Sequence, residues 1–191
     1  MNAMAGISRG NFQALAQKYD FSTFKTLCDV GGATGILSIT VAKQFPHLKC
    51  LSFDLPQVEP IAKKNIERQG LSGRIQTVSG DFFKDKLPKA DCITMGLILH
   101  DWNLQNKKHI IKLAYDALPP GGALIAVENI IDDERRQNTF GLLMSLNMLI
   151  EFGDAFDFTF ADYKSWCREI GFTKFELLHL VGPCSAAIAY K

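Results

Sequence analysis

The chain has 191 residues, of which 47% are hydrophobic and 21% charged, and its formal net charge is +1. This size and composition predict one globular cytoplasmic domain with a sizeable core, and the near-neutral charge argues against a nucleic-acid partner. The sequence has no apolar run of the roughly 18 residues that a membrane span needs and no signal-peptide pattern, and its five scattered cysteines predict reduced core residues rather than a metal cluster.

The first predicted elements are a helix at about 8–19 and a strand at about 26–30. The strand ends in Asp29-Val30 and leads into the turn Gly31-Gly32-Ala33-Thr34-Gly35, after which a helix runs to about residue 45. This strand, turn and helix are typical of proteins that hold a nucleotide-like ligand at the carboxyl edge of a parallel sheet.

The details of the glycine turn indicate which ligand it holds. Neither of its registers supplies the three glycines of the dinucleotide fingerprint G-x-G-x-x-G. Asp29, two residues before the first glycine, is badly placed beside a pyrophosphate but suits a ligand that carries an ammonium and a sulfonium. We therefore expect S-adenosylmethionine as the cofactor. The alternative is a loop that merely needs a positive φ.

Asp54 ends a second predicted strand, at 48–54, about 20 residues after the glycine turn. At that position a carboxylate can accept hydrogen bonds from both hydroxyls of a ribose. Asp54-Leu55-Pro56 is also a good helix start, with an acidic N-cap and an early proline, and the two roles are compatible.

A helix to about residue 70 and a strand at 73–78 bring Gly80-Asp81-Phe82 to the same edge. There Asp81 can accept a hydrogen bond from the exocyclic amine of adenine, and Phe82 can cover a face of the base. Alone, Gly-Asp is an ordinary turn. As the third acid at a strand end, after Asp29 and Asp54, Asp81 favours a shared ligand site.

Strands and helices continue to alternate along the rest of the chain. Strands are predicted at 90–96 and 123–129 with a helix to about 118 between them, and a helix at 161–170 precedes strands at 174–181 and 186–190. This order predicts an α/β fold with a parallel sheet, helices on both faces and one antiparallel strand in the final hairpin. His100, after the fourth strand, is either a site residue or a core histidine that caps the next helix, with Asp101 as a second cap.

A predicted helix at 137–152 has two faces. The leucine-rich face is expected in the core, and it consists of Leu142, Leu143, Leu146, Leu149 and Ile150. The other face is softer and suits a pocket for a flat organic ligand, although a methionine stripe is often simple packing; its residues are Phe140, Met144, Asn147, Met148 and Glu151.

Five motifs in order resemble the methyltransferase domain of plant caffeate and animal hydroxyindole O-methyltransferases, in particular the bacterial secondary-metabolism members. They are Asp29-Val30-Gly31-Gly32-Ala33-Thr34-Gly35, Phe53-Asp54-Leu55-Pro56, Gly80-Asp81-Phe82-Phe83, Ile98-Leu99-His100-Asp101-Trp102 and Leu118-Pro119-Pro120-Gly121-Gly122. The resemblance covers nearly the whole chain. It implies a Rossmann-like class I methyltransferase fold, with a seven-stranded, mostly parallel sheet, helices on both faces and an antiparallel last strand.

The resemblance also implies how the cofactor is held. Gly31 would lie against the methionine part of S-adenosylmethionine, Asp54 on the ribose and Trp102 near the adenine. The cofactor-binding residues that it implies, together with those derived above, are Asp29, Gly31, Gly32, Asp54, Leu55, Gly80, Asp81, Phe82 and Trp102.

The same resemblance implies that His100 is the general base, that Glu128 orients it, and that Asp157 stands where the family has a second glutamate. The acceptor is expected to be a small aromatic or polyketide-like molecule with a hydroxyl group, and no metal is expected. The residues expected to contact this acceptor are Met4, Met144, Asn147 and Met148.

The chain departs from the family pattern in several places. Ala33 replaces the middle glycine of a triplet, a small change if Ala33 keeps a negative φ, and Gly96 replaces a cofactor-contacting lysine of plant members. Asp157 is one methylene shorter than glutamate, which puts its reach to His100 in doubt. The family's N-terminal dimerisation domain is missing, so we expect a leading segment at 1–25, a methyltransferase domain at 26–191, and a longer parent protein that forms a homodimer.

The expected reaction is an in-line displacement, in which the acceptor oxygen attacks the methyl carbon while His100 takes the proton. Three alternatives remain open. They are hydroxylation or decarboxylation on the same cofactor-binding fold, a binding module without catalysis, and a nicotinamide-dependent oxidoreductase, which the failed fingerprint and Asp29 disfavour.

Overall fold

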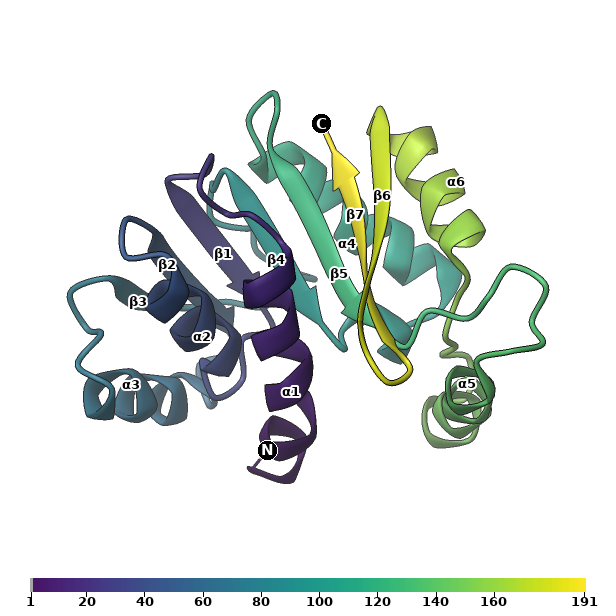
Figure 1. The fold of residues 1–191 in the computed structure, drawn as a ribbon, viewed down its shortest axis with the longest axis horizontal. Coiled ribbons are helices and arrows are strands. Elements are labelled where there is room, and N and C mark those ends of the chain that lie inside the picture. Colours follow the sequence, from purple (N-terminus) through teal and green to yellow (C-terminus); the bar gives the residue numbers. More distant parts are fainter. Residues whose placement is uncertain (1) are drawn as a thin grey trace.

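A seven-stranded sheet forms the centre of the molecule (Figure 1). The structure, a computed structural model, describes the backbone of residues 2–191 and the side chains of residues 8–191. The strand order is β3-β2-β1-β4-β5-β7-β6. The strands are β1 (Thr26–Val30), β2 (Lys49–Asp54), β3 (Ile75–Ser79), β4 (Cys92–Gly96), β5 (Ala123–Glu128), β6 (Lys174–Val181) and β7 (Cys184–Tyr190).

The pairing confirms the predicted fold class. Strands β1 to β5 pair in parallel, and β7 runs antiparallel to both β5 and β6. Every residue of β5 is buried, as expected for a strand that helices cover on both faces. The carboxyl ends of the parallel strands therefore share one edge, the lower edge in Figure 1.

Helices cover both faces of the sheet. In Figure 1, α1, α2 and α3 lie in front of it, and α4 and α6 lie behind it. Each layer closes its own apolar core, with Leu15 and Val41 on the first face and Ile110 and Tyr163 on the second. The helical elements are α1 (Asn2–Lys18), α2 (Ile36–Gln44), α3 (Glu59–Arg68), the 3₁₀ turn η1 (Leu99–Asp101), α4 (Leu104–Ala117), α5 (Thr139–Phe152) and α6 (Phe160–Ile170).

Side-chain caps fix where two of these helices begin. The Asn103 side chain accepts a hydrogen bond from the backbone N–H of Asn106 and starts α4. Thr159 and Asp162 form a reciprocal capping box at the start of α6. The caps set the positions of the segments just before them, which contain His100 and Asp157.

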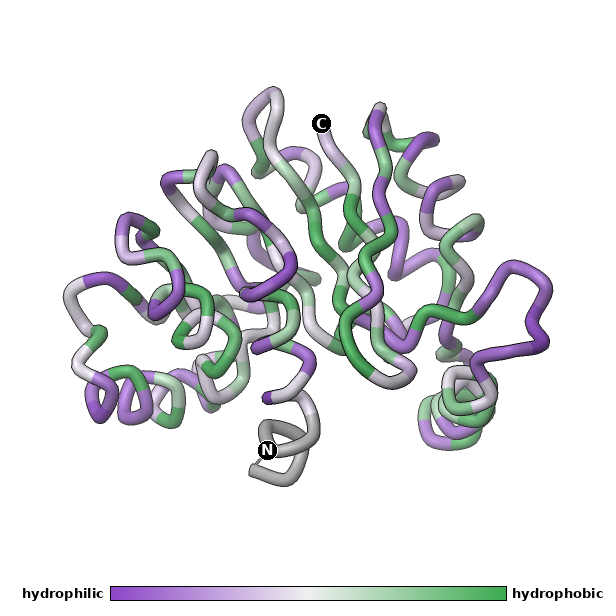
Figure 2. Tube along the Cα trace, in the orientation of Figure 1, coloured by the Kyte–Doolittle hydropathy of each residue, from purple (hydrophilic) through white to green (hydrophobic). Residues whose placement is uncertain are grey.

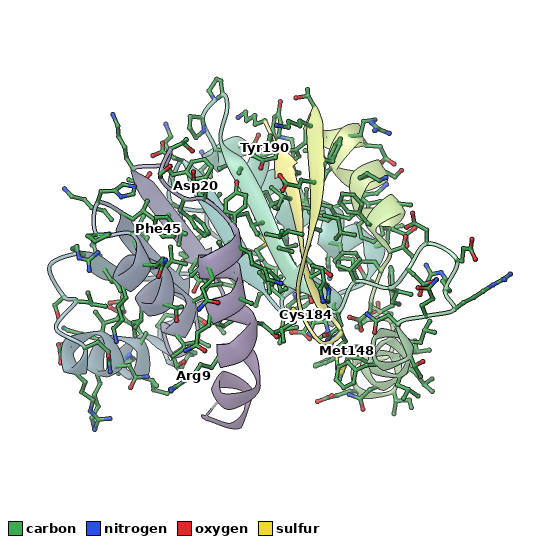
Figure 3. The ribbon with its side chains drawn as sticks, viewed as in Figure 1. Arg9, Asp20, Phe45, Met148, Cys184 and Tyr190 are labelled. Atoms are coloured by element: carbon green, nitrogen blue, oxygen red, sulfur yellow. The ribbon has the colours of Figure 1, made fainter. Side chains whose placement is uncertain are left out.

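The prediction that the leucine-rich face of α5 lies in the core is wrong. Leu143 is 62% exposed and Ile150 is 77% exposed, and Figure 2 shows apolar stretches along this helix. Figure 1 shows the reason: α5 is set apart below the sheet instead of lying on one of its faces. Gly141 and Met148 are its buried residues, and Figure 3 places Met148 where α5 meets the rest of the molecule.

Among the described residues, no helix combines the length and the apolar character that crossing a membrane requires.

Candidate active site

The glycine loop and the segment after β4 meet at the carboxyl edge of the sheet. Strands β1 and β4 are neighbours, but the chain leaves β1 toward β2 and leaves β4 toward β5, which makes this edge a topological switch point. Gly31 has a φ of +71°, and a Cβ atom added to it would lie 2.2 Å from Cδ1 of Ile98. The glycine loop therefore packs directly against the segment that carries His100.

Asp54 holds the glycine loop from the end of β2. Its Oδ2 accepts a hydrogen bond from the N–H of Ala33 at 2.8 Å, and its Oδ1 accepts one from Leu55 at 2.7 Å. The carboxylate keeps free lone pairs for a ligand and is partly exposed. The alternative role as a helix cap is wrong, because α3 begins at Glu59.

The replacement of glycine by Ala33 is expected to matter little only if Ala33 has a negative φ. The structure does not meet this condition. The φ of Ala33 is +48°, in the left-handed region. A residue with a Cβ atom costs on the order of 1 kcal/mol there. The hydrogen bond from Ala33 to Asp54 helps to hold this conformation.

Asp29 lies beneath the glycine loop. It is 2% exposed, and its Oδ1 accepts a hydrogen bond from Oγ1 of Thr94 at 2.9 Å. Burial raises the pKa of Asp29 to about 7, and the nearby Asp54 adds to the rise. A cationic group placed on the loop would favour the ionised form of this acid.

Asp81 stands at the end of β3, beside a group of aromatic rings. Its carboxylate accepts a hydrogen bond from the N–H of Phe83 and pairs with Lys84 at 3.0 Å, and these contacts lower its pKa. The ring of Trp102 lies 5.9 Å from Phe82 and 4.6 Å from Phe83 between centroids, edge to face in both cases. Asp81, Phe82 and Trp102, the residues predicted to hold adenine, therefore come from segments that meet at this edge, with Phe83 packed beside Trp102.

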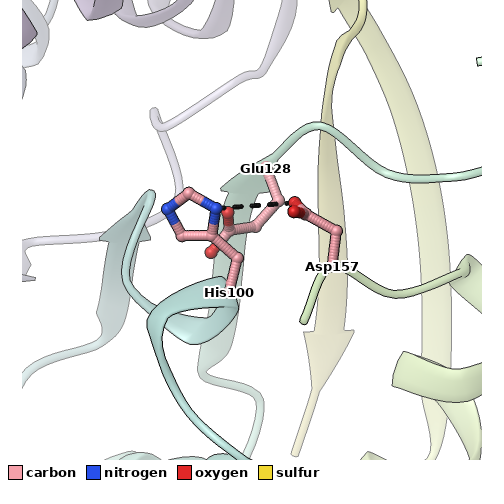
Figure 4. A group of neighbouring side chains, drawn as sticks. All are labelled: His100, Glu128 and Asp157. Atoms are coloured by element: carbon pink, nitrogen blue, oxygen red, sulfur yellow. Dashed lines mark ion pairs between the residues drawn. The ribbon is translucent and has the colours of Figure 1, made fainter. Parts of the chain in front are cut away.

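His100 lies in an acidic cluster built from three segments (Figure 4). Its Nδ1 is 3.5 Å from Oδ1 of Asp157, and its Nε2 is 3.2 Å from Oδ1 of Asp101. Asp157 is therefore within ion-pair distance in spite of its shorter side chain. Its backbone N–H donates to Oγ of Ser145 on α5, so α5 helps to hold its loop.

Glu128, at the end of β5, anchors the backbone that carries His100. Its Oε1 accepts hydrogen bonds from the N–H groups of Ile98 and Leu99, at 3.1 and 2.9 Å. The helix-cap alternative for His100 and Asp101 is wrong, because Asn103 caps α4.

Burial and the neighbouring charges shift the pKa values of His100 and Glu128. Burial opposes the charged form of His100, but the carboxylates of Glu128, Asp157 and Asp101 outweigh it and raise the pKa of His100 to about 9. Burial raises the pKa of Glu128 to about 7. Both ring nitrogens of His100 face carboxylate oxygens, which favours the imidazolium in the free protein.

The same three side chains could in principle reach one small ion. Ligand atoms of His100, Glu128 and Asp157 lie within 4.8 Å of one another. His100 Nδ1, Glu128 Oε2 and both oxygens of Asp157 are buried without a hydrogen-bond partner. The ion pair between His100 and Asp157 explains why these two side chains lie close together. We therefore assign no metal to this cluster.

Gly96 leaves room for an aromatic ring. A Cβ atom at Gly96 would lie 2.8 Å from the ring of Phe12 on α1. A lysine side chain at this position would meet that ring, so the space is taken by α1.

The residues expected to contact the acceptor are spread over α1 and α5. Met148 is buried, Met144 is half-buried and Asn147 is exposed. The side chain of Met4 lies outside the described residues. A cavity of about 770 Å³ lies elsewhere, between α1, α2 and α3, and none of the predicted site residues with described side chains lines it.

A sheet in this order with one inserted antiparallel strand, a glycine loop after β1 and carboxylates at successive strand ends defines a class I methyltransferase fold. Solved structures agree: human N-acetylserotonin methyltransferase, determined in complex with S-adenosylmethionine, superposes with a TM-score of 0.90 at 30% identity, over 100% of this chain and 54% of that one. The chain belongs to the O-methyltransferase domain family, whose model matches residues 1–173.

Two relatives show the range of the family. The tetracenomycin polyketide synthesis 8-O-methyl transferase of Streptomyces glaucescens is 34% identical over 191 residues, 100% of this chain and 56% of that protein. The N,N-dimethyltransferase OxyT of Streptomyces rimosus is 35% identical over 160 residues, 84% of this chain and 46% of that protein. The chain thus spans about half the length of these relatives.

Proposed function

We propose that this chain is the catalytic domain of an S-adenosylmethionine-dependent methyltransferase that methylates a hydroxyl group of a small, aromatic or polyketide-like acceptor. One observation carries the proposal. The glycine loop touches Ile98, two residues before His100, so the cofactor loop and the candidate base share one edge of the sheet.

The residues at this edge fit the cofactor. Asp54 would accept from the ribose hydroxyls, since its carboxylate is already aligned with the glycine loop. Asp81, Phe82 and Trp102 would hold the adenine, and Gly31 would lie against the methionine part. Asp29, buried under the loop, would supply negative charge toward the cationic end of the ligand. Gly32, Leu55 and Gly80 would complete the contacts.

When bound, S-adenosylmethionine supplies an electrophilic methyl group on a positively charged sulfur. In the proposed reaction the acceptor oxygen would receive that methyl group, the sulfur would leave as a neutral thioether, and His100 would take the hydroxyl proton. Asp157 and Glu128 would then stabilise the imidazolium. Positioning of the two reacting atoms contributes most, about 7–11 kcal/mol of the barrier in favourable cases.

The acceptor would enter beside α5. Met148 and Met144 offer a deformable apolar contact for a flat ring, and Asn147 and Met4 are the further candidates for contact with it. The name of Streptomyces glaucescens's enzyme describes a polyketide O-methyltransferase, which supports this class of acceptor. OxyT is named as an N,N-dimethyltransferase, so amines belong in any screen beside phenols. As in the family that the sequence resembles, we propose that the protein acts as a homodimer.

The test is transfer of a labelled methyl group to a panel of phenols and aromatic amines, with His100→Ala beside the wild-type protein. General-base catalysis contributes about 10²- to 10⁴-fold, so we expect turnover of the variant to fall by at least the lower figure while affinity for S-adenosylhomocysteine stays within a few-fold. Near-normal turnover by His100→Ala would remove the base assignment.

A further inference from the structure

Among the side chains that the structure describes, Lys107 is a buried charge that the proposed reaction does not use. Its side chain, on α4, is 0% exposed, although lysines are almost never fully buried unless they are paired. It also lies near the start of α4, where the positive end of the helix dipole disfavours a cation. Burial lowers the pKa of Lys107 to about 8. A cation in this place needs favourable contacts to hold it.

The ammonium group of Lys107 contacts two separate segments of the candidate site. Its Nζ donates a hydrogen bond to the backbone oxygen of Trp102, two residues after His100. It also lies 3.6 Å from the ring centroid of Phe156 and 5.9 Å from that of Phe158, within the range of cation–π attraction. These two phenylalanines flank Asp157 in the chain.

The same ammonium group opposes the negative charge of the cluster. Glu128, Asp157, Asp101 and Asp154 all favour its protonated form. Three of these carboxylates, from η1, β5 and the loop before α6, also draw a proton onto His100. A positive charge on α4 lessens that pull and leaves His100 more readily deprotonated.

We propose that Lys107 is a positioning residue for methyl transfer, which ties the Trp102 backbone to the loop that carries Asp157 and so sets His100 between the cofactor and its acidic partners. This inference rests on the proposed function for its kinetic test. Lys107 is fully buried and acts through Trp102, Phe156 and the charge it places beside the acids.

Three variants separate the contribution of the Lys107 charge from that of its hydrogen bond to Trp102. Lys107→Gln keeps a donor for the Trp102 carbonyl but removes the charge, and Lys107→Met keeps the length while removing both. Lys108→Met is the matched control, because Lys108 is partly exposed and pairs at the surface with Glu169 at 2.6 Å. Thermal unfolding of each variant establishes that it is folded at the assay temperature.

We expect kcat of Lys107→Gln to fall about tenfold or more, because a misplacement of about 1 Å at the reacting atoms can cost about 10²-fold. The acidic limb of its pH–rate profile, where activity rises as His100 loses its proton, should move to higher pH by about half a unit or more. The reason is that the acids hold the proton on His100 more strongly once the positive charge of Lys107 is gone. The affinity of this variant for S-adenosylhomocysteine, measured by calorimetry, should stay near the wild-type value. Lys107→Met should weaken that affinity as well, since the Trp102 carbonyl loses its donor. Lys108→Met should change none of these.

Folded Lys107 variants with wild-type kcat and an unmoved acidic limb would overturn the proposal. The proposal would also be overturned if the rate fell only in proportion to the loss of folded protein while the acidic limb of the pH–rate profile stayed in place. If the wild-type chain transfers no methyl group at all, the proposed function is contradicted, and the kinetic test of Lys107 cannot be made. The proposal is then decided by NMR titration of the His100 imidazole, assigned with His100→Gln: an upward pKa shift in Lys107→Gln supports it, and an unchanged pKa overturns it.

Discussion

At the scale of single residues, the acids around His100 favour its protonated form in the free protein by raising its pKa. Asp157 faces Nδ1 and Asp101 faces Nε2. A base must lose its proton before it can take one from the acceptor. Activity should therefore depend on how strongly these acids, together with Glu128, hold that proton.

We expect kcat/KM to rise with pH toward the pKa of His100, which is about 9 in the free protein. Asp101→Asn removes a carboxylate that favours the imidazolium, so the acidic limb should move to lower pH by about half a unit or more. Asp116→Asn, at a surface pair with Lys112, serves as the control. An acidic limb that stays in place in Asp101→Asn would show that Asp101 does not act on the base.

The residues of the site were predictable from the sequence to different degrees. Asp54, Asp81 and His100 follow strands, and their position at strand ends was sufficient to place them at one edge. Ala33 has a left-handed φ and donates a hydrogen bond to Asp54, 21 residues away in sequence, and the local sequence does not show this long-range contact. Lys107 had a signal that was overlooked: it shares the spacing of Ile110, Ile111 and Ala114, the buried face of α4.

At the scale of elements, the parallel strands were predictable because their apolar runs are short and turns bound them. The bounds of β1 and β6 agree with the prediction. Helix α5 was misjudged because an apolar face shows that a helix can be buried, but not what lies opposite it. Gly141 approaches the carbonyl oxygen of Asn129 so closely that a Cβ atom would lie 2.7 Å from it, so the first turn of α5 packs directly against the segment after β5.

The packing of α5 predicts an unequal response to truncation of its side chains. Met148→Ala should lower the free energy of unfolding by about 2 kcal/mol or more, because the side chain is 6% exposed and leaves a cavity. Ile150→Ala should change it by less than about 0.5 kcal/mol, because Ile150 is 77% exposed. Urea unfolding of the 191-residue chain measures both. A larger loss of unfolding free energy in Ile150→Ala would indicate that the leucine-rich face of α5 is buried after all.

At the scale of the whole molecule, the sheet order decides where chemistry can occur. The reversal between β1 and β4 opens the carboxyl edge at the point where Gly31 meets Ile98. The family resemblance implied the class I methyltransferase fold, but the order of the motifs along the chain does not by itself give the order of the strands in the sheet. The exposed face of α5 and the acceptor site depend on contacts that cannot be derived from the order of strands.

The most direct test is a crystal structure of the chain with S-adenosylhomocysteine. The expected result is a nucleoside at the carboxyl edge, with its ribose hydroxyls on Asp54, its adenine beside Trp102 and its sulfur facing His100. Ligand bound instead in the cavity between α1, α2 and α3, or at the carboxyl edge with its sulfur turned away from His100, would contradict it.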